Sequence, residues 1–292
     1  MIETMRAHYT VAELCEALDV SRSGYYKSKS APVSAHQEEN ERIVEKMKQI
    51  HQEPFKDSYG SPRMTSELQK HGFTCSENRV ARLMAREGLK ARHKKAFRPK
   101  TTVQDPDRTP APNLLAEIET PSRSGEVFVN DITYVATREG WLYLAVTMDL
   151  YSRRIAGWHL EDSMKTDLVI AAAQKAVTGT GAHSGAIFHS DRGCQYTSQE
   201  MRSWLKQRGF LSSMSSVGYC YDNAACESLF ATLKREAFPA GCVFDNKQDA
   251  RRTIFQYIET FYNRERIHTA LGNRSPVEFL TNHFQPETIT LN

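Results

Sequence analysis

Three acidic residues stand in segments that would present their carboxylates in different ways. Asp131 interrupts a strand-like run, Asp191 follows a short apolar run, and Glu227 lies in a helix-like stretch. An unpaired buried carboxylate is costly unless a cation or hydrogen bonds compensate it. Oxygen ligands without histidine or cysteine favour Mg²⁺ or Mn²⁺ over zinc. Two such ions can promote in-line displacement at phosphorus, so the pattern predicts a phosphoryl-transfer site.

A lysine accompanies the third acid. Lys234 follows Glu227 by seven residues, which is two helical turns, so both side chains share one helix face. A carboxylate and an ammonium group at this spacing suit a metal ion and a phosphate. A charged pair on the surface of a helix is the simpler alternative.

The elements that must position these residues change type along the chain. Past Gly125 the periodicity is strand-like, with strands expected at 126–136, 141–151, 154–161, 186–190 and 211–215. Helices are expected at 166–177, 198–208, 223–238 and 247–264. This order predicts a mixed five-stranded sheet with helices on its faces. Ligands bind at the carboxyl ends of strands in such sheets, which is where Asp191 would lie.

The N-terminal third is predicted to be helical. Helices are expected to begin near residues 10, 21, 38, 61 and 76. Thr10 and Glu13 have the spacing of a capping box, and Ser61 before a proline suits an N-cap. The last two helices, joined by a turn at Gly72, suit a helix-turn-helix, although any helical hairpin has this pattern.

A proline-rich connector separates the two regions. Residues 98–113 contain four prolines and almost no apolar side chains, so they cannot form a core. The chain of 292 residues is long enough for about two domains. We expect a helical hairpin at 1–36, a helix-turn-helix-like DNA-binding region at 37–97, a linker at 98–120, a catalytic core with C-terminal helices at 121–284 and a tail at 285–292.

Positive charge is concentrated before the connector, although the net charge is only +3. Nine basic residues face the single acid Glu87 in this block: Arg79, Arg82, Arg86, Lys90, Arg92, Lys94, Lys95, Arg98 and Lys100. The block predicts a surface for a polyanion such as DNA. The alternative is a solvated helix face that serves solubility.

Cysteine usage and hydropathy bear on the compartment. The six cysteines are scattered without the paired spacing of a zinc site, which indicates reduced thiols in a cytosolic protein. No apolar run approaches the roughly 18 residues of a membrane span, and the N-terminus does not resemble a secretion signal. We therefore expect a soluble protein without a membrane partner.

The sequence around each acid resembles a known family. Asp131, Asp191 and Glu227, with 35 residues between the last two, resemble the D,D-35-E pattern of retroviral-integrase-like transposases. The neighbouring words narrow the resemblance to the catalytic OrfB part of the IS3 family of bacterial insertion sequences. They are DITY at 131–134, HSDRGCQY at 189–196, CYDNAACES at 220–228, LKRE at 233–236 and YNRERIHTALG at 262–272. Residues 59–89 resemble the helical DNA-binding segment of that family.

The resemblance implies an α/β RNase H-like catalytic core together with an all-helical, helix-turn-helix-like N-terminal region. It implies a transposase that cleaves one strand at an element end and uses the freed 3′-OH for strand transfer. Asp131, Asp191 and Glu227 would bind two Mg²⁺ ions per active site, with Mn²⁺ as a substitute. Such a protein works in the bacterial cytoplasm, associated with the nucleoid.

The implied partners are the terminal inverted repeats of the element and the target DNA. We expect DNA contacts from Lys234, Arg235, Asn223, Tyr221, Arg264, Arg266, Arg63, Arg79, Arg82 and Arg86. Asn223 could equally cap the helix that follows it, and His268 is more typical of a packing residue than of a catalyst. Members of the family usually act as a fusion with an upstream OrfA, so we expect either an OrfA partner or an OrfAB fusion. Because two DNA ends must be held together, we also expect a homo-oligomer.

Two other functions remain open at this stage. A Mg²⁺-dependent nuclease with the RNase H-like fold needs the same three carboxylates but does not join DNA ends. A DNA-binding regulator with a silent site is the second alternative, and the intact acids disfavour it.

Overall fold

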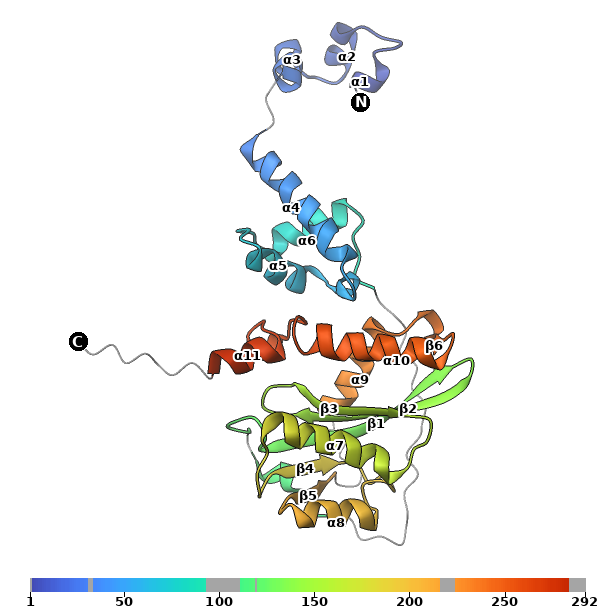
Figure 1. Cartoon of the computed structure of the whole chain (residues 1–292). Coiled ribbons are helices and arrows are strands. Elements are labelled where there is room, and N and C mark those ends of the chain that lie inside the picture. Colours follow the sequence, from blue (N-terminus) through green and yellow to red (C-terminus); the bar gives the residue numbers. More distant parts are fainter. Residues whose placement is uncertain (1, 31–33, 93–110, 119, 216–223, 284–292) are drawn as a thin grey trace, which may run out of the picture. The chain divides into compact units, whose positions relative to one another are not determined.

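A computed structural model of the chain describes residues 2–30, 34–92, 111–118, 120–215 and 224–283 (Figure 1). The chain folds into two compact units, Met1–Gln49 and Ile50–Asn292. The finer domain boundaries expected from the sequence stay predictions. Within the described ranges, no helix combines the length and the apolar character that crossing a bilayer requires.

The first unit is helical, as predicted. Its helices are α1 (Ile2–Met5), α2 (Val11–Ala17), α3 (Arg22–Ser30) and most of α4 (Ala35–Gln52). The predicted capping box is confirmed, because the Glu13 amide donates to the Thr10 hydroxyl and the Thr10 amide donates to the Glu13 carboxylate at 2.8 Å. The described cysteines are free thiols: Cys15, Cys75, Cys194, Cys226 and Cys242.

The second unit opens with a short 3-10 helix η1 (Lys56–Ser58) and two helices, α5 (Ser61–Lys70) and α6 (Glu77–Arg86). The helix expected from near residue 76 is confirmed as α6, and its residues Val80, Leu83 and Met84 are buried. The expectation that Ser61 caps α5 is wrong. Gly60, whose backbone is extended, takes the cap position, and the Ser61 hydroxyl donates to Glu77 at 3.3 Å instead.

A mixed sheet forms the body of the second unit. Its strands are β1 (Val127–Thr137), β2 (Gly140–Asp149), β3 (Ile155–Glu161), β4 (Ile187–Ser190), β5 (Leu211–Met214) and β6 (Val243–Phe244). The order is β3-β2-β1-β4-β5, with the first three strands antiparallel and β1, β4 and β5 parallel. The five predicted strands are confirmed. The sixth, β6, has only two residues, which pair with the end of β1.

Helices cover the two faces of this sheet (Figure 1). On one face, α7 (Thr166–Thr180) and α8 (Gln199–Gln207) pack on a core that includes Phe128 and Phe188. On the other lie α9 (Ala224–Glu236) and α10 (Lys247–Phe255), both of which contact β1. The predicted helix at 247–264 changes at its middle, because α10 widens into the π-helix η5 (Gln256–Tyr262).

Shorter helices complete the unit. They are η2 (Leu114–Glu117), η4 (Ala240–Cys242), η6 (Thr269–Leu271) and α11 (Pro276–His283).

Candidate active site

Asp131 lies on β1, and Asp191 directly follows the neighbouring parallel strand β4. β1 and β4 run in register with Asn130 opposite Ser190, so the next residues, Asp131 and Asp191, lie side by side. Adjacent strands are about 4.8 Å apart. Side chains alternate between the faces of a strand, and Phe128 belongs to the core under α7 and α8. Asp131 therefore points to the opposite face, where α9 packs.

Buried hydrogen bonds fix the register of these strands. The Asn130 side chain donates to the His189 carbonyl oxygen at 3.0 Å and accepts from the Thr147 hydroxyl at 2.7 Å, which ties β1 to both neighbours. The buried ring of His189 lies 2.8 Å from the Ser213 hydroxyl and 3.1 Å from the Ser215 hydroxyl. His189 thus links β4 to β5 and to the residue that follows it.

The turn after β4 shapes the position of Asp191. Its Oδ1 accepts a hydrogen bond from the Gly193 amide at 2.9 Å. A Cβ at Gly193 would lie 3.0 Å from that oxygen, so the close turn suits glycine. Burial raises the pKa of Asp191, and the Gly193 hydrogen bond opposes this shift only in part. The charged form of Asp191 therefore gains if a cation comes close.

The helix α9 brings the third acid to the same region. Cys226 is fully buried, and burial together with the negative charges of Asp131, Asp191 and Glu227 raises the pKa of its thiol. One thiol thus lies within electrostatic range of all three carboxylates. Glu227 itself is exposed in the first turn of the helix.

Lys234 lies two turns further along α9. Burial lowers the pKa of its ammonium group, and the negative charge of Asp131 opposes that shift. The ammonium group of Lys234 is therefore close enough to Asp131 for their charges to interact.

No closed metal cluster is present among the described residues. In these ranges, no three side chains of His, Cys, Asp or Glu are grouped closely enough to hold an ion. The structure places Asp131 on β1, Asp191 directly after the neighbouring β4, and Glu227 at the start of the helix that packs on β1. Glu227 is in range of the same thiol but does not form one compact ligand set with the other two acids.

The residues expected to contact DNA fall into three groups. Arg82 and Arg86 are exposed on α6, and Arg79 is half-buried there. Arg264 is exposed beyond η5, with its Nε donating to the Glu259 carbonyl oxygen at 3.0 Å. Tyr221 and Asn223 lie outside the described residues, as does the basic block from residue 93 onward.

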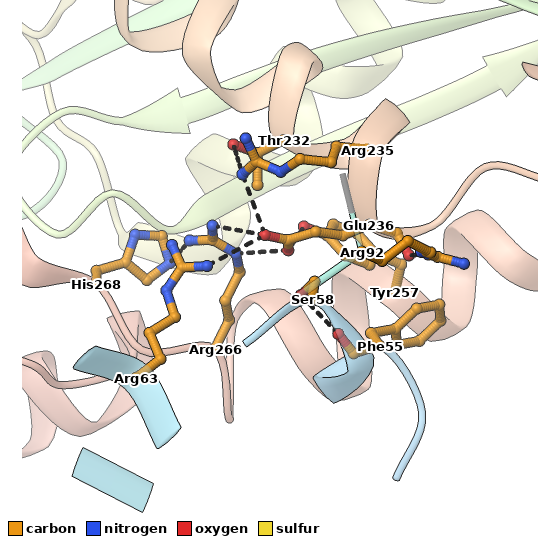
Figure 2. Close-up of polar contacts among 10 residues, drawn as sticks. All are labelled: Phe55, Ser58, Arg63, Arg92, Thr232, Arg235, Glu236, Tyr257, Arg266 and His268. Carbon is orange, nitrogen blue, oxygen red and sulfur yellow. Dashed lines mark hydrogen bonds and ion pairs between the residues drawn. The ribbon is translucent and has the colours of Figure 1, made fainter. Parts of the chain in front are cut away.

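The third group gathers around a buried carboxylate at the end of α9 (Figure 2). Arg266 is itself buried and donates to Glu236 from Nε at 2.8 Å and from Nη2 at 2.9 Å. Arg63 and Arg235 approach the same carboxylate at 3.3 and 3.4 Å. Both Glu236 oxygens thus hold the guanidinium of Arg266, and its role as a DNA contact stays a prediction.

Known proteins similar to this chain decide its family. Models of an integrase core domain match residues 121–220 and 227–284, and a model of an HTH-like domain matches 38–97. The transposase InsF for insertion sequence IS3A of Escherichia coli K12 is 35% identical over 280 residues, covering 95% of this chain and 96% of that protein. The chain belongs to the IS3 family of insertion-sequence transposases.

Another relative agrees with this placement. The 31 kDa protein of insertion element IS600 from Shigella sonnei is 38% identical over 272 residues, covering 93% of this chain and 99% of that protein. Among solved structures, a simian T-cell lymphotropic virus intasome in complex with a PP2A regulatory subunit aligns with 84% of this chain and 76% of its own, at 12% identity and a TM-score of 0.46.

Family membership establishes the fold class and the activity. The sheet with its flanking helices is an RNase H-like integrase core, and the α5 and α6 region belongs to an HTH-like domain. The protein is a DNA transposase and hence a polynucleotidyl transferase. Asp131 and Asp191 lie within the first integrase-core segment, and Glu227 is the first residue of the second.

Two residues of this transposase with unusual environments, Glu236 and Arg153, were not singled out from the sequence. Glu236 ends the LKRE word quoted above, but nothing local shows that this acid lies buried among arginines. Arg153 lies in the turn between β2 and β3, where it has a left-handed backbone with φ of 60°. A Ser-Arg pair between two strands predicts a turn without indicating what its arginine faces.

Proposed function

We propose that strand cleavage and strand transfer take place at Asp131, Asp191 and Glu227, which together would hold two divalent metal ions, Mg²⁺ or Mn²⁺. The parallel register of β1 and β4 is the observation that carries this proposal, because it sets two acids side by side on the face covered by the helix that bears the third.

The donor set fits hard divalent cations. The three acids offer only carboxylate oxygens, which Mg²⁺ and Mn²⁺ prefer. Cys226 is a poor competitor because its raised pKa keeps it a thiol, and metals bind the thiolate. Neighbouring carboxylates also repel one another, and a cation between them removes this repulsion.

The residues then have separate roles. Bound ions activate the attacking oxygen and stabilise the leaving oxygen during in-line displacement at phosphorus. The three carboxylates fix where the scissile phosphate lies. Lys234, on the same helix as Glu227, would bind a phosphate oxygen near that bond, and Arg235 follows it at the end of the helix. After the first cleavage, the same site would accept the freed 3′-OH as the nucleophile for joining.

The partners follow from this chemistry. The substrates would be the terminal inverted repeats of an insertion sequence and a target DNA. One site cannot hold two ends at once, so we propose that the transposase acts as a homo-oligomer, with an upstream OrfA as partner or fusion.

The decisive experiment replaces Asp191 by Asn. With labelled element ends and Mg²⁺, we expect joined products to fall about a thousandfold or more, because several kcal/mol of transition-state stabilisation are lost. DNA binding should persist. Asp167→Asn, which changes an exposed acid in the first turn of α7, is the matched control and should retain activity.

The same assay separates the alternatives. Cleavage without joined products would indicate a nuclease, and binding without either product would indicate a silent regulator. Joining that survives in the Asp191→Asn protein would show that this carboxylate is not a metal ligand.

A further inference from the structure

A pocket of about 360 Å³ lies against one face of α9. From α9 it is lined by Ala225, Ser228, Leu229, Thr232 and Arg235. These positions recur every three or four residues and so form one helix face. Glu227 and Lys234 fall on the opposite face of the same helix.

Arginines dominate this pocket. Arg63 from α5, Arg153 from the β2–β3 turn, Arg235 from α9 and Arg266 all line it. No acid occurs among the described residues that line it. Three of these arginines, Arg63, Arg235 and Arg266, pair with the carboxylate of Glu236, and Arg153 adds a fourth positive charge.

The neighbouring histidine is uncharged, mainly because it is buried. Burial together with the charges of Arg266 and Arg63 lowers the pKa of His268 to about 3. His268 is thus neutral at physiological pH and adds no charge. The desolvated guanidinium of Arg63 also has a lowered pKa, first through burial and then through Arg266.

Arg153 is held toward the pocket by its turn. Its left-handed backbone is unfavourable for a residue other than glycine. Asp149 stabilises this turn, because its Oδ2 accepts from the Ser152 amide at 3.0 Å and its Oδ1 accepts from the Gly125 amide at 2.9 Å. Among the described residues, no carboxylate or carbonyl group pairs with the Arg153 guanidinium. A strained backbone thus presents an arginine whose guanidinium is available to bind a ligand.

We propose that this arginine pocket binds a phosphate group of the DNA backbone, as a second DNA contact on the face of α9 opposite Glu227 and Lys234. The proposal rests on the proposed function in taking DNA as the ligand. Planar guanidinium groups bind phosphate oxygens in pairs, and the hydroxyls of Ser228, Thr232 and Thr269 add further donors. Ligand pockets in proteins range upward from about 300 Å³. The volume of this pocket lies close to that lower limit, which suits a phosphodiester unit better than a large ligand.

The arginines differ in how firmly Glu236 holds them. Arg266 is bound at 2.8 and 2.9 Å, so it stays with the carboxylate. Arg63 and Arg235 approach it only at 3.3 and 3.4 Å and can turn to an incoming phosphate at little cost. The ligand would then join α5, the β2–β3 turn and α9. A DNA phosphate here would connect the HTH-like segment to the helix that carries Glu227.

The test uses the full chain with Arg153→Asn. Asparagine tolerates the left-handed backbone, so this variant removes the charge without adding strain. We expect its affinity for a mixed-sequence DNA duplex to fall about tenfold and the salt dependence of binding to lose about one unit of slope. Arg153→Lys should recover part of the affinity. The matched control is Arg138→Asn, at the exposed β1–β2 turn, which should bind as the unchanged protein does.

Inorganic phosphate provides a second arm. At equal ionic strength, phosphate should raise the melting temperature of the unchanged chain above its value in chloride, and Arg153→Asn should abolish this rise. If phosphate stabilises the chain while Arg153→Asn binds DNA normally, the pocket takes a free phosphate compound and the DNA proposal is wrong. Equal losses in the Arg153 and Arg138 variants would also overturn it, since only bulk charge would then matter.

These outcomes are independent of the carboxylate assignment. The Asp191→Asn protein should show the unchanged affinity and salt slope. A failure of the proposed catalytic site would therefore appear in strand transfer but not in these binding curves.

Discussion

At the scale of single residues, Glu236 is a buried carboxylate that several side chains hold in place. Its carboxylate is fully buried and accepts hydrogen bonds from Arg266 and from the Tyr257 hydroxyl at 2.7 Å. Its carbonyl oxygen accepts a hydrogen bond from Arg92. Burial alone opposes the charge of Glu236, but the hydrogen bonds and positive charge of Arg266 outweigh it and lower the pKa of this acid.

Replacing Glu236 by Gln should therefore be costly. The amide leaves Arg266 buried without its counter-charge, and removing one partner of a buried ion pair costs roughly 3–5 kcal/mol. Urea unfolding of the two proteins measures the difference. The exposed acid Glu200 in the first turn of α8 is the control, and Glu200→Gln should change the free energy of unfolding by only tenths of a kcal/mol. Equal stability of both variants would refute this role.

The same residue predicts a pH dependence. Since the pKa of Glu236 is lower in the folded chain than its ordinary value of 4.5, its charge stabilises the fold above that value. The contribution is lost as the pH falls below about 4.5 toward the folded pKa. The free energy of unfolding should therefore decline less steeply in this acidic window for Glu236→Gln than for the unchanged chain. If the free energy of unfolding declined equally steeply in both proteins, the ionisation of Glu236 would not contribute to the stability of the fold.

At the scale of elements, β3 packs unusually close to α7. A Cβ at Gly157 would lie 2.1 Å from the Ala172 carbonyl oxygen and 2.5 Å from the Ala176 amide nitrogen. Both are backbone atoms, so neither can move aside without displacing the helix. Alanines along α7 keep the rest of this contact short, with Ala172, Ala173 and Ala176 buried against the sheet.

Gly157→Ala should therefore destabilise the chain by about 3 kcal/mol or more, because overpacking here requires a backbone shift. Thermal unfolding provides the measurement. Gly179→Ala is the matched control, since its Cβ would lie 3.6 Å from the Ala156 carbonyl oxygen, an ordinary contact. That variant should be neutral or slightly more stable. A Gly157→Ala protein with the melting temperature of the control would contradict the close approach.

Elements also show how far the sequence predicts this structure. Alternating apolar residues were enough to place β1 to β5, because each has at least four residues. The two residues of β6 carry no periodicity, and nothing local distinguishes the π-helix η5 from an α-helix. Ser61 failed as a cap because Gly60 offers an extended backbone one residue earlier.

The candidate site was also only partly predictable from the sequence. The types and spacing of Asp131, Asp191 and Glu227 are visible in the sequence. The juxtaposition of the first two depends on the parallel pairing of β1 with β4, which no local pattern encodes. The burial of Arg266 was not predictable for a similar reason, because its partner Glu236 is 30 residues away along the chain.

At the scale of the whole molecule, charge distribution matters more than net charge. The chain carries only +3, yet the exposed side of α6 presents basic side chains next to a buried apolar face. Lys and Arg that neutralise DNA phosphates release counterions, so binding weakens as salt rises. If about six to ten phosphates are contacted, affinity should fall several decades over a fewfold rise in salt.

The α6 arginines should account for part of this dependence. Replacing Arg79, Arg82 and Arg86 together by Gln should reduce the slope of log affinity against log salt by about two to three, since each phosphate contributes about 0.9. The loss should be similar for all DNA sequences, because phosphate contacts position a protein without reading bases. Fluorescence anisotropy with duplexes of different sequence, over a range of NaCl concentrations, measures both quantities.

A control with equal charge loss separates a DNA-binding surface from a generally charged one. Arg138, Arg252 and Lys206 are exposed side chains of the integrase core and do not belong to α6, and their joint replacement by Gln removes the same three charges. If α6 binds DNA, this control keeps most of the salt slope, because these side chains do not lie along the bound backbone. Equal slopes in the two triple variants would instead mean that α6 is a solvated face whose arginines act only through the total charge.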